Sequence, residues 1–273
     1  MATVIKIYYL NGQLWQEFFK NDDKKEGEYK SYFPSGKLHV ICNYVDGEKN
    51  GKYKSYYKNG PVSSEINYTN GKIDGEYIEY YENGFHEYVC NFADGIKNGE
   101  AKKYHKNGQL WKICNYMNAM EHGEYKCYYF NGHPSEICNF VNGKIEGEHK
   151  LYHKNGQLKK TCSYINGKEE GPCKYYYNTG KLLSVYDHVN GKNEGECKRY
   201  HGNGQLAEIC NYVNGKIEGE HKSYDENGQL DVICNYVDGK IERKRNLYDI
   251  NGQLYGRYGK LANKGTLYMN GEI

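Results

Sequence analysis

Apolar and polar positions recur in the same order every 24 residues along this chain. One repeat runs from Gly147 to Gly167, and its Asn-Gly-Gln-Leu segment contains Gly156. Glycines at the same place recur without insertion or deletion at Gly12, Gly36, Gly60, Gly84, Gly108, Gly132, Gly156, Gly180, Gly204, Gly228 and Gly252. A fixed period of this kind is typical of repeat proteins. It is stronger evidence about the fold than any single motif.

Each repeat contains two short runs of strand-forming residues bounded by turn signals. The runs are Glu148 to His153 and Gln157 to Ile165, joined by Lys154-Asn155-Gly156. Two such runs joined by Asn-Gly predict a β-hairpin, and three glycines per repeat argue against helices. The chain is therefore expected to be all-β, an elongated single-layer antiparallel sheet of about eleven stacked 24-residue hairpins.

The length of the hairpin loop decides which side chains share a face. A three-residue Lys-Asn-Gly loop with a left-handed glycine and a bulge places Tyr152 opposite Leu158. A two-residue turn would place Tyr152 opposite Lys159 instead. We predict the three-residue loop, with Tyr152, Leu158, Cys162 and Tyr164 on one face and His149, Leu151, His153 and Thr161 on the other.

The repeats change character at both ends. Residues 1–26 form an N-terminal cap unit, because Phe18-Phe19 stands where other copies have Cys-Asn. Residues 27–242 hold the regular repeats, and the pattern decays from Arg243, so residues 243–273 are a degenerate C-terminal cap. Terminal repeats lack one neighbour and are expected to be atypical. We predict one repeat domain over residues 1–273.

Composition supports a thin sheet and excludes several partners. The chain is 38% apolar only because its 32 tyrosines and 10 cysteines are counted. Its net charge of +2 predicts no nucleic-acid partner. Most repeats have a lysine, such as Lys150, two residues after a glutamate, such as Glu148. Residues two apart on a strand share a face. We therefore expect the positive and negative charges to neutralise one another in a ladder of ion pairs across the strands.

The distribution of apolar residues bears on where in the cell the protein is located. Lys6 interrupts the short apolar run after Met1, so no signal peptide is expected. No apolar run reaches the roughly 20 residues of a membrane span. We therefore expect no transmembrane segment and a cytoplasmic, reducing location, which would be host cytoplasm or a virion if the protein is viral.

Seven of the ten cysteines share one repeat position, which also holds Ile66 and Tyr186; they are Cys42, Cys90, Cys114, Cys138, Cys162, Cys210 and Cys234. Free cysteine behaves as a small apolar residue in such a column. Equivalent residues of successive hairpins are two strand spacings apart, about 9.5 Å, whereas a disulfide needs Cα atoms within about 7 Å. We therefore expect reduced thiols.

A second column contains His149, Cys173, Cys197 and His221 and raises the question of zinc. Zinc ligands must all lie about 2.0–2.3 Å from the ion, which the spacing along one column does not allow. We expect no metal and no cofactor. No Ser-His-Asp set, phosphate loop or unique carboxylate pair is present either, so no catalytic residue is assigned and the protein is expected not to be an enzyme.

The repeat pattern resembles a known family. Asn-Gly-Lys-x-x-Gly-x-x-Lys-x-Tyr-x-x-Asn-Gly-x-Leu, at 142–158 and 214–230, is similar to the MORN-type repeat. It is closest to the variant form found in bacterial proteins described as antitoxins and in repeat proteins of large DNA viruses. The resemblance covers the whole chain and implies stacked hairpins, but little about activity, because the family is defined by its scaffold.

Tyrosine is the residue type best placed to carry function, because it is favoured at protein interfaces. The variable aromatic positions are the candidate protein contacts, namely Tyr29, Tyr53, Tyr77 and Tyr125 at one position and Phe33, Tyr57, Tyr81, Tyr129 and Tyr177 at another. The invariant tyrosine column is expected to be structural. Self-association is expected to use the N-terminal edge strand, Val4 to Tyr9.

These observations favour a non-catalytic scaffold that binds other proteins, or copies of itself, along an aromatic sheet. The alternative, suggested by the resemblance alone, is an antitoxin-like inhibitor of a single partner enzyme. A weaker alternative is a peripheral lipid-binding protein, although we expect no lipid contact because the two tryptophans, Trp15 and Trp111, lie away from the place of the tryptophan in the MORN form to which lipid roles are linked.

Overall fold

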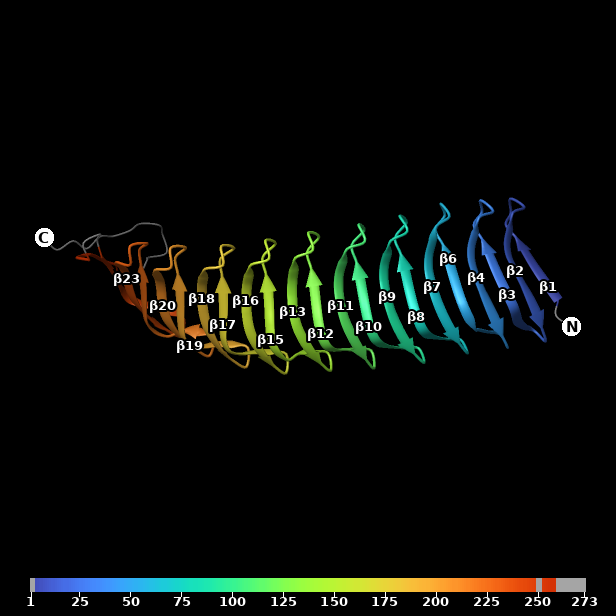
Figure 1. Cartoon of the computed structure of the whole chain (residues 1–273). Coiled ribbons are helices and arrows are strands. Elements are labelled where there is room, and N and C mark those ends of the chain that lie inside the picture. The colour runs from blue at the N-terminus through green and yellow to red at the C-terminus, as the bar shows by residue number, and fades with distance from the viewer. Residues whose placement is uncertain (1–2, 249–251, 259–273) are drawn as a thin grey trace. The chain divides into compact units, whose positions relative to one another are not determined.

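A computed structural model describes residues 3–248 and 252–258. Most of the expected C-terminal cap, residues 243–273, lies outside the described residues. The fold is all-β, a single antiparallel sheet of consecutive hairpins, as predicted (Figure 1). Consecutive long strands pair with each other in antiparallel fashion, as residues 147–152 do with residues 158–165, and residues 158–165 with residues 168–176. Among the described residues no helix is long and apolar enough to cross a membrane.

The chain divides into two compact units. The first holds residues 1–134 and 140–143, and the second holds residues 135–139 and 144–273. The strands of the first unit are β1 (Thr3–Tyr8), β2 (Leu14–Asn21), β3 (Lys24–Tyr32), β4 (Leu38–Val45), β5 (Glu48–Lys49), β6 (Gly51–Tyr56), β7 (Val62–Thr69), β8 (Lys72–Tyr80), β9 (His86–Ala93), β10 (Ile96–Tyr104), β11 (Leu110–Met117) and β12 (Met120–Tyr128).

Strand β13 (Pro134–Val141) contributes residues to both units. The strands of the second unit are β14 (Lys144–Ile145), β15 (Gly147–Tyr152), β16 (Leu158–Ile165), β17 (Lys168–Tyr176), β18 (Leu182–Val189), β19 (Lys192–Tyr200), β20 (Leu206–Val213), β21 (Lys216–Ile217), β22 (Gly219–Tyr224), β23 (Leu230–Val237), β24 (Lys240–Tyr248) and β25 (Leu254–Tyr258).

The loop between the two strands of a hairpin has the predicted three residues. In the hairpin β15–β16, the His153 N–H donates to the Gln157 carbonyl at 2.8 Å, and the Gly156 N–H donates to the His153 carbonyl at 2.9 Å. Gly156 has φ of +84°, in the left-handed region. Tyr152 lies opposite Leu158, so the predicted pairing is confirmed.

The predicted division into faces is wrong, and the reason is the bulge beside the loop. Leu151 pairs with Lys160 while the next residue, Tyr152, pairs with Leu158, so Lys159 is an extra residue on β16. One extra residue moves every later side chain of that strand to the other face. Cys162 therefore pairs with His149 and lies on its face, opposite to that of Tyr152.

Two faces follow from this register, and we name each by its contents. The cysteine face carries the positions of His149, Leu151, Lys160, Cys162 and Tyr164 in every repeat. The lysine–glutamate face carries the positions of Glu148, Lys150, Tyr152, Thr161 and Ser163.

The buried apolar residues of the described chain lie almost entirely on the cysteine face. They are Val40, Cys42, Cys90, Ala101, Cys114, Cys138, Cys162, Cys173, Cys197, Cys210 and Cys234. Small thiol side chains fill the space between half-buried tyrosine rings, as at Cys90, which lies against Tyr77 and Tyr88. The core is thus a thin layer on one side of the sheet, as the composition predicted.

Hydrogen bonds tie each repeat to the next at both edges of the sheet. At one edge, the Gly167 N–H donates to the Ile145 carbonyl at 3.0 Å, and the Asn166 N–H donates to Glu146 Oε2 at 2.8 Å. At the other edge, His153 Nε2 lies 2.9 Å from the Tyr176 carbonyl. Because donor and acceptor come from successive hairpins, these bonds set the stacking of one repeat on another.

Two glycines of one loop allow a matched test of the turn. Gly204 has φ of +95°, whereas Gly202, two residues earlier, shows no left-handed φ, and nothing lies within 4 Å of a Cβ placed on either. We expect Gly204→Val to lower the unfolding temperature, because a β-branched residue resists φ above zero. Gly202→Val should leave it nearly unchanged. Equal melting of the two variants would contradict the turn assignment.

Candidate functional site

The first group of predicted contact residues lies on the cysteine face. Tyr29 pairs with Cys42, Tyr53 with Ile66, Tyr77 with Cys90 and Tyr125 with Cys114, and all four tyrosines are half-buried. Each ring packs against an aromatic ring on a neighbouring strand, which for Tyr125 is β13 and not the strand of Cys114. The centroid distances are 5.7 Å for Tyr29–Tyr44, 5.9 Å for Tyr53–Tyr68, 5.8 Å for Tyr77–Phe92 and 5.2 Å for Tyr125–Phe140.

Lysines lie over several of these aromatic pairs, a feature that the sequence analysis missed. Lys25 Nζ is 4.5 Å from the Tyr29 ring centroid and 5.1 Å from that of Tyr44. Lys49 Nζ is 4.7 Å from Tyr53. Ammonium groups at these distances are attracted by the ring faces. The signal in the sequence was a lysine at the same position of three repeats, in Lys25, Lys49 and Lys97.

The second group of predicted contact residues, Phe33, Tyr57, Tyr81, Tyr129 and Tyr177, lies at the hairpin loops. The hydroxyls of Tyr57, Tyr81 and Tyr177 donate to the backbone carbonyls of Tyr80, Tyr104 and Tyr200 in the following repeat. These rings therefore have a structural task in addition to any contact with a partner. A hollow of about 430 Å³ lies beside them, lined by Phe33, Tyr56, Tyr57, Lys58, Asn59 and Glu82.

Charges on the lysine–glutamate face neutralise one another, but not in the predicted way. Most of the ion pairs join residues two apart on one strand rather than residues on neighbouring strands. The pairs are Glu28–Lys30, Glu100–Lys102, Glu124–Lys126, Glu148–Lys150, Glu196–Lys198 and Glu220–Lys222. Lys54 and Glu65, 2.8 Å apart, form the predicted cross-strand type. Exposed pairs of this kind add little stability.

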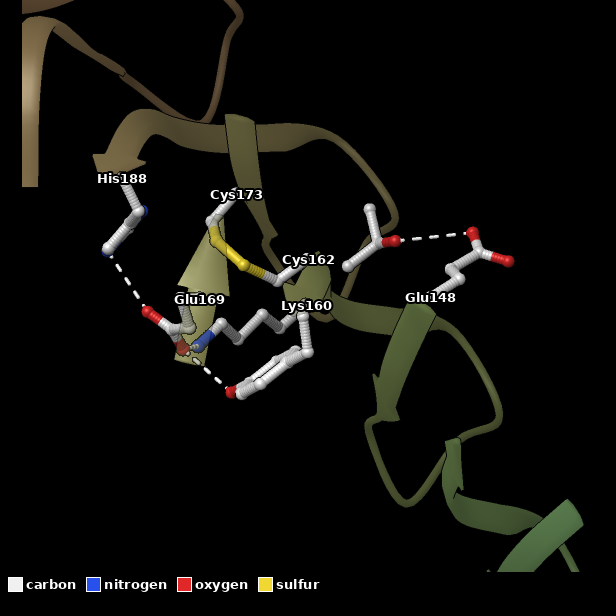
Figure 2. The surroundings of a disulfide bond; sticks show 8 residues. Glu148, Lys160, Cys162, Glu169, Cys173 and His188 are labelled. Atoms are coloured by element: carbon white, nitrogen blue, oxygen red, sulfur yellow. Dashed lines mark hydrogen bonds and ion pairs between the residues drawn. A yellow bond between two sulfur atoms is a disulfide. The ribbon is translucent and has the colours of Figure 1, made fainter. Parts of the chain in front are cut away.

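The expectation that all thiols are reduced is wrong for one pair, because Cys162 and Cys173 form a disulfide (Figure 2). The spacing of about 9.5 Å applies to cysteines at one repeat position, which are two strands apart. Cys162 and Cys173 occupy different positions on the adjacent strands β16 and β17, and their Cα atoms are 4.3 Å apart. The other eight cysteines are not part of this disulfide, and among them Cys197 lies directly opposite Cys210 on the adjacent strand.

Polar side chains gather beside this disulfide. Glu169 Oε2 lies 3.0 Å from His188 Nε2, and the Tyr164 hydroxyl donates to Glu169 Oε1 at 2.9 Å. The Lys160 ammonium also donates to Glu169 Oε1. Burial by itself raises the pKa of the Glu169 carboxyl, but the bonds from Lys160 and Tyr164 outweigh it and hold the pKa below its ordinary value. Glu169 therefore carries its negative charge at neutral pH.

Related Glu–His contacts occur at two other places on the cysteine face. His149 Nε2 lies 2.9 Å from Glu136 Oε1, and His221 Nε2 lies 2.6 Å from Glu208 Oε1. Each histidine ring also packs edge-on against a tyrosine, His149 against Tyr164 and His221 against Tyr236. The histidine and cysteine positions that the sequence placed in one column thus find their partners across strands and not along the column.

Comparison with known families agrees with this architecture. The MORN repeat variant profile matches nine successive segments, at residues 25–46, 49–70, 73–94, 97–118, 121–142, 145–166, 169–190, 193–214 and 217–238. The chain therefore belongs to the MORN repeat variant family. It is a MORN repeat β-sheet protein, and membership alone assigns no activity, because one scaffold can serve many functions. No curated protein matches the chain.

Solved structures add no functional argument. A crystal structure of a protein of unknown function from Bacteroides caccae is 12% identical, with 97% of this chain and 92% of that chain covered, at a TM-score of 0.19. The crystal structure of TcdB2-TccC3-TEV is 12% identical, with 95% of this chain but 14% of that chain covered, at a TM-score of 0.21. Likenesses at these TM-scores carry no inference.

The half-buried tyrosines predict a loss of stability in alkali. Burial raises the pKa of Tyr44 and of Tyr164 from 10.0 to about 12. A group whose pKa is raised on folding stabilises the folded chain fully below its unfolded value, here pH 10, and this contribution is lost as the pH rises through about 12. We expect the urea midpoint to fall between pH 10 and pH 12.

Phenylalanine substitutions separate this effect from other alkaline damage. Tyr44→Phe removes one titrating group and should make the fall of the urea midpoint shallower. Tyr8→Phe should leave it unchanged, because the Tyr8 residue is 56% exposed. A midpoint that stays constant to pH 12, or equal slopes for the two variants, would show that tyrosine ionisation does not govern alkaline unfolding.

Proposed function

We propose that this protein is a non-catalytic repeat scaffold that binds partner proteins through the aromatic residues of its cysteine face. The observation that carries the proposal is the repeated lysine–tyrosine cluster, in which Lys25 lies over Tyr29 and Lys49 lies over Tyr53. Half-buried tyrosines offer a large contact area at low entropic cost. Their repetition at a fixed period suits several weak contacts acting together on one partner.

The cytoplasmic location expected from the sequence is part of this proposal. The antitoxin-like inhibitor and the lipid-binding protein remain its alternatives, and they differ in what the chain should bind. An inhibitor would hold one enzyme at one-to-one stoichiometry, whereas a scaffold would bind several proteins or one extended partner at several repeats. A lipid-binding protein would float with vesicles that contain anionic phospholipid.

The experiment uses the intact chain to capture proteins from an extract of its source, followed by titration of each purified candidate. The test variant combines Tyr29→Leu, Tyr53→Leu and Tyr77→Leu on the cysteine face. The matched control combines Tyr32→Leu, Tyr56→Leu and Tyr80→Leu, which lie on the same strands with side chains toward the lysine–glutamate face. Both variants are first compared by thermal melting.

We expect the cysteine-face variant to bind at least about 10-fold more weakly, because buried interface tyrosines commonly contribute 2 kcal/mol or more. The control should keep its affinity to within about twofold. Loss of binding in the control variant alone would place the interface on the other face. A single stoichiometric enzyme partner that is inhibited on binding would favour the antitoxin-like alternative.

Self-association is proposed to use strand β1, which pairs with β2 and is the first strand of the series (Figure 1). Val4 is 46% exposed and Tyr8 56% exposed, so the strand is apolar as well as terminal. An uncovered edge can add a strand from a second copy. Lys6 is the charged residue within β1 that opposes such pairing.

Sedimentation velocity at rising concentration tests this edge. We expect Ile5→Lys combined with Ile7→Pro to reduce association, because charge and a missing N–H both block strand addition. The control is Ile96→Lys, an isoleucine 48% exposed on β10, which has strands paired on both sides. Association unchanged by the β1 substitutions, or a chain that stays monomeric, would contradict edge pairing.

A further inference from the structure

Four groups with metal-binding chemistry converge at one place on the cysteine face of the second unit. Cys162 lies on β16, Glu169 and Cys173 on β17, and His188 on β18, around the disulfide in Figure 2. One ligand atom from each lies within 4.8 Å of the others. Cys162, Cys173 and His188 are 2%, 0% and 6% exposed. The cluster therefore combines two buried sulfurs and one buried imidazole with one half-buried carboxylate.

This cluster is the place where the repeat departs from its own pattern. One repeat earlier the same four positions hold Cys138, Ile145, His149 and Tyr164. One repeat later they hold Tyr186, Asn193, Cys197 and Tyr212. The full combination of two cysteines, glutamate and histidine occurs once along the chain. A repeat scaffold needs none of it, so the combination calls for a local explanation.

The histidine supplies an independent sign of a missing ligand. His188 Nε2 lies 3.0 Å from Glu169 Oε2, and because the carboxylate is an acceptor, Nε2 carries the proton and donates. Nδ1 then has a lone pair, and it is buried without a hydrogen-bond partner. A buried acceptor left unpaired destabilises the fold, because it has lost its hydrogen bonds to water and gained none in return. A cation bound at Nδ1 would remove this destabilisation.

The contacts of Glu169 match the outer part of a zinc site. A histidine that binds zinc usually donates its other ring N–H to a carboxylate, which fixes the tautomer and the ring orientation. Glu169 accepts such a bond from His188 and itself accepts hydrogen bonds from Lys160 and Tyr164. Two thiolates and one imidazole nitrogen are preferred zinc ligands.

We propose that the reduced chain binds one zinc ion through Cys162 Sγ, Cys173 Sγ and His188 Nδ1, with Glu169 holding the His188 ring and a solvent molecule as the fourth ligand. The disulfide uses the same two sulfurs, so bridge and zinc exclude each other. Two equivalents of a thiol reduce the bridge to two cysteine thiols and become one disulfide themselves. Zinc then displaces two protons to solvent as the thiolates bind it.

The test reduces the intact chain with a phosphine under anaerobic conditions and titrates it with zinc against a chromophoric chelator. Cobalt replaces zinc in a parallel titration, because thiolate ligands give charge-transfer absorption and a tetrahedral site gives visible bands. We expect one equivalent to bind, and zinc to raise the melting temperature of the reduced chain. Before reduction, the bridged chain should not bind zinc at this site.

Two substitutions introduce tyrosine where other repeats already have it, as at Tyr164 for the His188 position and Tyr125 for the Cys173 position, which guards against simple misfolding. His188→Tyr and Cys173→Tyr should each lose the stoichiometric zinc and the cobalt spectrum while the reduced chain still melts cooperatively. Glu169→Gln should weaken zinc about 10- to 100-fold, as expected for a residue that orients a ligand. Cys90→Ser removes a buried cysteine from the same column as Cys162 and should bind normally.

Zinc bound with equal affinity by the His188→Tyr and Cys173→Tyr variants would overturn the proposal and point to the opposed Cys197 and Cys210 or to other thiols. Failure of the reduced wild-type chain to bind zinc in competition with a micromolar chelator would overturn it as well. Neither result depends on the scaffold function, because the readouts are metal stoichiometry, absorption and melting.

Discussion

Hydrogen bonding between successive repeats is the interaction on which the rest of this structure depends. A thin sheet with small cysteine side chains at its centre buries little apolar surface, so its hairpins need other ties. The backbone bond from Gly167 to Ile145 and the bond from Asn166 to the Glu146 carboxylate join one pair of neighbours, and equivalent bonds recur at other repeats. Because each bond needs a donor in one hairpin and an acceptor in the next, the 24-residue period cannot drift. The same ties explain why one loop position holds tyrosine or histidine in most repeats, with exceptions such as Phe33 and Asp225. Tyr177 and His201 each reach a carbonyl of the following repeat.

A scaffold held in this way leaves room for variation on the cysteine face. The positions around the cysteines tolerate tyrosine, histidine, lysine, glutamate or serine, since the ties lie at the edges of the sheet. In the first unit this freedom gives lysine–tyrosine clusters such as Lys25 with Tyr29 and Tyr44. In the second unit it gives acid–histidine contacts such as Glu169 with His188. The proposed protein-binding surface and the proposed zinc site are therefore two uses of one face, distinguished by which residues fill the same repeat positions.

The zinc proposal also shows how a repeat can create a site without any insertion. Neighbouring positions on adjacent strands are close in space, whereas equivalent positions in successive repeats are about 9.5 Å apart. Ligands can therefore meet only by crossing columns, as Cys162 and Cys173 do with Cα atoms 4.3 Å apart. Spacing along the column of His149, Cys173, Cys197 and His221 does not allow these residues to bind one ion, whereas residues on adjacent strands can lie close enough. A single histidine in place of an aromatic residue, at His188, completes the set.

Local chemistry is enough to predict the class of fold, the hairpin period and the loop, because left-handed glycines such as Gly156 and the pairing of Tyr152 with Leu158 depend on nearby residues. The cysteine column can likewise be recognised as apolar from its residue types. The three-dimensional structure sets the division into faces, because the bulge at Lys159 moves Cys162 to the side of His149 and reverses the expected grouping. It alone placed Lys25 over Tyr29, paired Glu28 with Lys30 along a strand, and brought Glu169 and His188 to the cysteine pair. Those contacts depend on register and side-chain direction across neighbouring strands, and a one-residue shift changes every one of them.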